Sequence, residues 1–110
     1  MLVRYTPRKG CERRLLALVS RHWPALRAAG LATAVPARVF KARDKRDGRL
    51  HFVEMFEWRD AGASATAHDT PAVRAVWEPM EPLLEDMQLC RIEAVAAGRR
   101  RARPGIGRPR

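Results

Sequence analysis

The sequence lacks the long apolar run that marks a membrane segment or a secreted chain. No window of its 110 residues approaches the roughly 18 consecutive apolar residues of a membrane span. Basic residues such as Arg4, Arg8 and Lys9 interrupt the N-terminal region, which therefore lacks the apolar stretch of a secretion signal. We expect a cytoplasmic protein that does not contact a membrane.

Residues that form disulfides or bind metals are few and scattered. Cys11 and Cys90 are the only cysteines, and two isolated cysteines without a secretion signal predict ordinary reduced thiols. The histidines, His22, His51 and His68, lie far apart, and no CxxC or HxxxH pair occurs. We therefore expect no metal site.

Positive charge gathers at the C-terminus. The formal net charge is +10, and six arginines follow Gly98 with no acidic residue among them. The composition after Ala97 is mainly Arg, Gly and Pro, which cannot bury enough apolar area to offset the entropy of ordering. We predict a domain over residues 1–96 and a disordered Arg-rich tail over 97–110. Such a tail could make weak, nonspecific contact with nucleic acid through phosphates, or it could simply be solvated.

Hydrophobic periodicity predicts the order βαββαβ. Alternating residues indicate strands, helical spacing indicates helices, and Gly48 suits a hairpin turn. The predicted strands cover 2–6, 35–42, 50–58 and 89–95, and the predicted helices cover 11–29 and 60–68 and continue from Pro71. Pro24 predicts a kink or restart in the first helix, Asp60 a cap for the second and Thr70 a cap for the third. The last helical stripe is predicted to span two short helices: Val73, Trp77, Met80, Leu84, Met87.

The strand predicted over residues 50–58 is apolar on both faces. Phe52 and Phe56 lie on one face, and Val53 and Met55 lie on the other. A small domain has helices enough to cover only one face, so a second protomer is expected on the other. We predict an α+β protomer with a four-stranded antiparallel sheet, assembled as a homodimer.

At Phe52-Val53-Glu54-Met55-Phe56-Glu57-Trp58, at His68 and at Val76-Trp77-Glu78-Pro79-Met80, the chain resembles the antibiotic biosynthesis monooxygenase-like family of the dimeric α/β barrel superfamily. The resemblance implies ferredoxin-like protomers whose sheets form a shared barrel. It also implies oxidation of a small aromatic substrate without metal or flavin. A non-catalytic dimer that binds a small molecule is the alternative.

The chain departs from relatives of that family at two points. Haem-degrading members use an asparagine on the first strand and a histidine on the later helix, whereas this chain has no asparagine and carries Trp77 there. Haem breakdown is therefore not expected. The cofactor-free oxygenases use an asparagine and a tyrosine in the pocket, and the sole tyrosine here is Tyr5.

Two residues are candidate catalytic groups. His22 lies on the apolar face of the first predicted helix, where a neutral imidazole could act as a base. Its alternative role is a core histidine bonded to a backbone carbonyl. Glu54 lies between two phenylalanines on its strand face, and burial there would suit its carboxylate to proton transfer. Its alternative role is an ion pair with an arginine such as Arg4 or Arg38, across the sheet or across the dimer interface.

Four further residues are candidate substrate-binding groups. Trp23, Trp58 and Trp77 could line a flat pocket for an aromatic ligand, because indole rings offer stacking faces and one donor. They could equally be ordinary core residues. His68 could line the same pocket or bond the last carbonyls of its helix.

Overall fold

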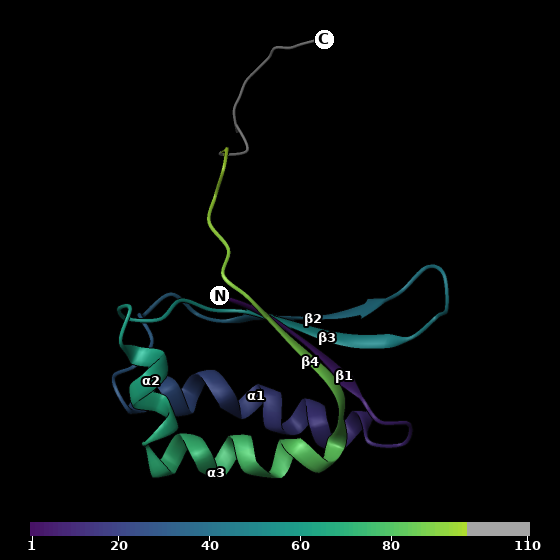
Figure 1. The fold of residues 1–110 in the computed structure, drawn as a ribbon, viewed down its shortest axis with the longest axis horizontal. Helices are drawn as coiled ribbons and strands as arrows, with labels where there is room; N and C mark the ends of the chain where they lie inside the picture. The colour runs from purple at the N-terminus through teal and green to yellow at the C-terminus, as the bar shows by residue number, and fades with distance from the viewer. Residues whose placement is uncertain (97–110) are drawn as a thin grey trace, which may run out of the picture.

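The computed structural model describes residues 1–96, which form one antiparallel sheet with all helices on one side (Figure 1). The elements are β1 (Leu2–Pro7), α1 (Glu12–Ala28), β2 (Arg38–Arg43), β3 (Leu50–Met55), α2 (Ala63–His68), α3 (Pro71–Met80), the 3₁₀ turn η1 (Glu81–Leu83) and β4 (Leu84–Cys90). The strand order is β2-β3-β1-β4, with every neighbouring pair antiparallel. This confirms the predicted α+β, ferredoxin-like βαββαβ protomer. The predicted tail, 97–110, lies outside the described residues.

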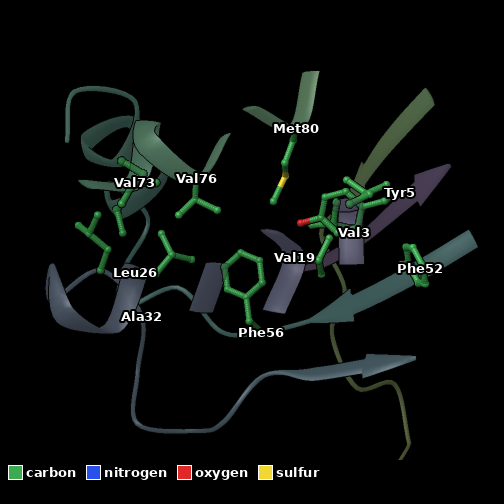
Figure 2. Close-up of a cluster of buried hydrophobic side chains, with 14 of the residues drawn as sticks. Val3, Tyr5, Val19, Leu26, Ala32, Phe52, Phe56, Val73, Val76 and Met80 are labelled. Carbon is green, nitrogen blue, oxygen red and sulfur yellow. The ribbon is translucent and has the colours of Figure 1, made fainter. Parts of the chain in front are cut away.

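The core lies between the helices and one face of the sheet (Figure 2). Helix α1 buries Leu15, Val19, His22 and Leu26, while α3 buries Val73, Val76 and Met80. The sheet side contributes residues that alternate along β1, along β3 and just beyond the end of β3: Val3, Tyr5, Phe52, Glu54 and Phe56. The residues that repeat at helical spacing on the helices and at two-residue spacing on the strands therefore form one buried layer. No helix within residues 1–96 is long and apolar enough to cross a membrane.

Pro24 lies inside α1 without dividing it. The helix is continuous from Glu12 to Ala28, so the restart expected near His22 is wrong. Proline removes one backbone donor and leaves the other hydrogen bonds of the helix in place. His22 therefore keeps its helical position on the buried face beside Val19 and Leu26.

The last strand begins earlier than predicted. Leu84 and Met87 belong to β4 and not to a second short helix, and β4 ends at Cys90. Their three-residue spacing imitates a helix, but Pro82 allows only the 3₁₀ turn before the strand. Met87 pairs with Tyr5, which places it on the helix side of the sheet as a strand residue.

Two other predicted boundaries are wrong for local reasons. Helix α2 begins at Ala63 with Gly62 before it, because the Asp60 carboxylate accepts the Gly62 N–H in a tight turn. Strand β3 ends at Met55, and Trp58 retains a single bridge to Ala32. Thr70 and Pro71 begin α3 as expected.

The second face of the sheet has no helix on it among the described residues (Figure 1). Phe40 pairs with Val53, and Val53 pairs with Arg4, so these side chains share that face. Leu2 and Met55 form the neighbouring row. Phe40 is 39% exposed, and the other apolar residues of this open face are half-buried. The predicted strand with two apolar faces is confirmed.

Candidate functional site

A carboxylate lies at the centre of the core. Glu54 of β3 is 0% exposed, because the alternation of the strand turns it toward the helices between Phe52 and Phe56. Its Oε1 atom accepts a hydrogen bond of 2.7 Å from the Tyr5 hydroxyl and lies 2.8 Å from Nδ1 of His22. Its Oε2 atom has no hydrogen-bond partner among the described residues. Glu54 is thus held at one oxygen by two side chains from two other elements.

The predicted ion pair between Glu54 and an arginine across the sheet is wrong. Arg4 is in register with Val53, and Arg38 is in register with Met55, so both arginines lie on the open face. Arg4 lies 3.7 Å from Asp86, and the Arg38 guanidinium lies over the Phe40 ring. A one-residue offset along a strand moves a side chain to the opposite face, and this offset separates Glu54 from both arginines.

Hydrogen bonding determines the tautomer of His22. The Trp77 indole N–H donates to His22 Nε2 at 2.8 Å. An indole nitrogen is a donor only, so Nε2 must carry a lone pair and the ring proton must be on Nδ1. Nδ1–H therefore donates to Glu54 Oε1. The imidazole is neutral and its two nitrogens bond side chains, so the expected bond to a backbone carbonyl is wrong.

Tyr5 completes this group of buried polar side chains. Figure 2 shows its hydroxyl turned from β1 toward the interior. Burial, and then the neighbouring Glu54 carboxylate, raise the pKa of Tyr5 well above its ordinary value. The Tyr5 hydroxyl therefore stays protonated near neutral pH. It donates a hydrogen bond to Glu54 and does not act as a proton source.

A pocket of about 410 Å³ adjoins these residues between the helices and the sheet. Its lining is mostly apolar or aromatic and includes Val3, Tyr5, His22, Phe56, Trp58, Ser64, His68, Trp77, Met80, Leu84, Met87 and Leu89. Glu78 and Glu81 also line it, and no lysine or arginine does so among the described residues. Met87 and Leu89 of the edge strand β4 are exposed. The volume and the mostly apolar lining suit a small, mostly apolar molecule.

The pocket brings together four of the six predicted site residues. The rings of His68, Trp77, His22, Phe56 and Trp58 form a continuous series, with neighbouring centroids 4.9 to 5.9 Å apart. His68, Trp77, His22 and Trp58 line the pocket directly. Glu54 lies behind His22 and outside the lining. Trp23 also lies outside the lining and packs, half-buried, against the core.

Tyr5 is a polar site residue that the sequence patterns did not predict. The sequence pattern that indicates its direction is the alternation of β1, which puts Val3 and Tyr5 on one face of the strand. Because β1 and β3 are antiparallel neighbours, Val3 pairs with Glu54 and Tyr5 lies diagonally across from it. Only the pairing register, which the sequence does not contain, brings the hydroxyl to the carboxylate.

The described residues offer no metal centre. Within residues 1–96, no group of three or more His, Cys, Asp or Glu side chains is arranged to hold a metal ion. Cys11 and Cys90 are both free thiols.

We predict that Tyr5 does not ionise in the folded protein at the pH where free tyrosine does. A raised pKa gives stability that is present below the ordinary value of 10.0 and is lost as the pH rises above it. Since Tyr5 is the only tyrosine, tyrosinate absorbance during an alkaline titration reports on it alone. We expect tyrosinate to form only together with loss of circular dichroism, while the urea-unfolded chain titrates normally. Ionisation near the ordinary value with the fold intact would contradict the buried hydroxyl.

Searches with the sequence and with the structure give different results. No protein-family profile matches the sequence, and no curated protein matches it. Solved structures do match the fold. An antibiotic biosynthesis monooxygenase superposes with a TM-score of 0.62 at 19% identity, covering 86% of this chain and 96% of that one. A putative antibiotic biosynthesis monooxygenase from Deinococcus radiodurans superposes with a TM-score of 0.58 at 17% identity, covering 89% and 99%.

A third structure carries a named activity. A mutant of SnoaB, a cofactor-independent oxygenase from Streptomyces nogalater, superposes with a TM-score of 0.56 at 12% identity, covering 86% of this chain and 94% of that one. These identities are low, so the matches bear on the fold. They extend over most of the described residues, and the chain therefore has the fold of the antibiotic biosynthesis monooxygenases.

Proposed function

We propose that this protein oxidises a small aromatic substrate with molecular oxygen and without a cofactor. The observation that supports this most directly is the aromatic pocket with the His22 imidazole in its wall. His22 is buried and fixed in one tautomer by Glu54, so its acceptor nitrogen, Nε2, has a defined position in the pocket wall, where it accepts from Trp77 in this structure. The fold shared with SnoaB, described as a cofactor-independent oxygenase, agrees with this proposal.

The proposed chemistry places the reducing power in the substrate. An anthrone in its enol form loses the hydroxyl proton to His22, which acts as the base, and becomes an electron-rich anion. The anion passes electrons to oxygen and forms a carbon–oxygen bond. One oxygen atom becomes the new quinone carbonyl, and the other leaves as water with the two hydrogens of the original methylene carbon. The protein orients the ring, keeps bulk water out, accepts the first proton and returns it to the departing oxygen atom.

A second candidate function is non-catalytic binding of a small apolar molecule. The observation in its favour is that both His22 nitrogens are already engaged, by Glu54 and by Trp77. A histidine with no free lone pair can form part of the pocket wall without acting as a base. The same pocket would then bind an aromatic ligand without converting it.

We also propose that the protein works as a cytoplasmic homodimer joined through the open face of the sheet. Phe40, Val53, Met55 and Leu2 give this face an apolar centre that no described element covers. Sheets pack face to face at about 10 Å through such side chains. A second copy supplies a matching surface by two-fold symmetry.

We expect oxygen uptake when the protein is mixed with an anthrone, and loss of that uptake in the His22→Asn variant. Asparagine can still donate to Glu54 from near the Nδ1 position but offers no acceptor at the Nε2 position. Loss of a general base typically lowers the rate about 100-fold or more. Ser20→Ala, on the exposed side of the same helix, serves as the matched control and should keep the wild-type rate.

Two results would decide against this reaction. Equal oxygen uptake in the wild type and His22→Asn would remove His22 from the mechanism. No uptake with any anthrone or quinol, together with thermal stabilisation by the same compounds, would support the binding function instead. Circular dichroism of each variant confirms that it is folded.

We expect light scattering to show a dimer at micromolar concentration, and the Phe40→Arg variant to be a monomer. Arginine at this position places a charge in the centre of the proposed interface, where its desolvation is not compensated. Val39→Arg is the matched control, because Val39 is 38% exposed on the same strand and points to the helix side. A wild-type monomer, or equal dissociation of both variants, would contradict the open face as the interface.

A further inference from the structure

The pocket side of His22 is occupied by a protein group that a ligand could replace. Nδ1–H points to Glu54, which lies outside the pocket lining, whereas Nε2 accepts from Trp77, which lies within it. The Nε2 edge of the ring is therefore the edge turned toward the pocket. In this structure the indole N–H of Trp77 occupies the only lone pair of this imidazole.

The two bonds of His22 differ in how firmly their partners are held. Glu54 is fully buried in the sheet and is held by Tyr5 as well. Trp77 is only half-buried on α3, and its ring packs against the exposed His68 with centroids 4.9 Å apart. Exchange of one neutral donor for another at Nε2 costs little, because the number of hydrogen bonds is unchanged. The Trp77 bond is thus the replaceable one.

The charges around the pocket restrict the ligand. No lysine or arginine lines it among the described residues, although the whole chain has a net charge of +10. Glu78 and Glu81 line it instead, and Glu78 is bound by Arg74 at 2.7 Å. A carboxylate or phosphate on the ligand would meet no basic side chain in this lining, and the N-terminal ammonium of Met1, which also lines the pocket, already donates to the Phe56 carbonyl oxygen at 2.9 Å. The pocket therefore favours a neutral ligand, whose recognition depends on hydrogen bonds and ring contacts.

We propose that Trp77 is a displaceable donor that occupies His22 Nε2 until a neutral aromatic ligand brings a hydroxyl group of its own. The ligand O–H then donates to Nε2, and the Trp77 indole is released from that bond. This proposal rests on the proposed function, since it concerns the same pocket. It adds that the ligand hydroxyl binds His22 Nε2 and that Trp77 occupies this nitrogen beforehand. It also explains how His22 can be hydrogen-bonded at both nitrogens in this structure and still accept a hydrogen bond from a substrate.

The test compares a hydroxyarene with its methyl ether in the absence of oxygen. Naphthol carries the donor, and methoxynaphthalene has nearly the same ring and no donor. Calorimetric titration of wild type and Trp77→Phe measures the preference for naphthol over the ether. The variant keeps an aromatic ring and removes the competing N–H. We expect the preference to rise about 2- to 10-fold, the worth of one neutral hydrogen bond.

Two further variants distinguish the hydrogen-bonding role of the Trp77 N–H from the packing of its ring against the ligand. Trp58→Phe is the matched control, because Trp58 lines the same pocket and its indole nitrogen has no partner among the described residues. We expect its naphthol preference to equal that of wild type. His22→Asn removes the acceptor at Nε2, so the preference should disappear. An equal loss of affinity for both ligands in Trp77→Phe, or no binding of either ligand by wild type, would overturn the proposal.

A measurement on the wild type keeps the proposal testable if a variant fails to fold. The Trp77 indole N–H proton should shift upfield in NMR spectra when naphthol binds and should keep its position with methoxynaphthalene. The same shift with both ligands would overturn the proposal. Because oxygen is excluded, the binding result is independent of turnover. A protein with the naphthol preference but no oxygen uptake refutes the proposed reaction only, and an active oxygenase without the preference refutes only the role of Trp77.

Discussion

The need of one buried carboxylate for hydrogen-bond donors determines the interior of this protein. Glu54 is excluded from water by the phenylalanines beside it, and an unsatisfied buried polar group costs roughly 1–3 kcal/mol. Tyr5 from β1 and His22 from α1 supply the donors, both to Oε1. These bonds connect a helix to the two central strands, so the position of the imidazole depends on the register of the sheet. Burial, and then the contact with Glu54, raise the pKa of Tyr5, and the contact with Glu54 also fixes the tautomer of His22.

The pocket follows from this arrangement. Because Glu54 holds Nδ1, the opposite edge of the imidazole faces the aromatic residues of α3 and the end of β3. Trp77 extends the chain of hydrogen bonds, so that four side chains from four elements form one line: Trp77, His22, Glu54 and Tyr5. A site built on strands and helices holds its acceptor more precisely than one built on loops. The pocket is thus suited to selecting one hydroxyl group.

Alternation and helical spacing were sufficient to predict the fold and four of the pocket residues. The burial of Glu54 and the inward direction of His22 both follow from these periods. The partners of Glu54 could not be predicted, because pairing register decides which side chains meet, and the sequence allowed Arg4 and Arg38 as readily as Tyr5. Leu84 and Met87 show a different limit. Their spacing fits a helix, yet pairing with β1 makes them part of a strand, so tertiary contacts override a short local pattern.

The most direct test of this account is the protonation pattern of the His22 imidazole. Long-range proton–nitrogen NMR correlations of the ¹⁵N-labelled protein distinguish a nitrogen that carries a proton from one that carries a lone pair. The account predicts a neutral ring in the unliganded protein, with the proton on Nδ1 and the lone pair on Nε2. A proton on Nε2 would contradict it, because Trp77 could then not donate to His22 and Glu54 would lose one of its two donors.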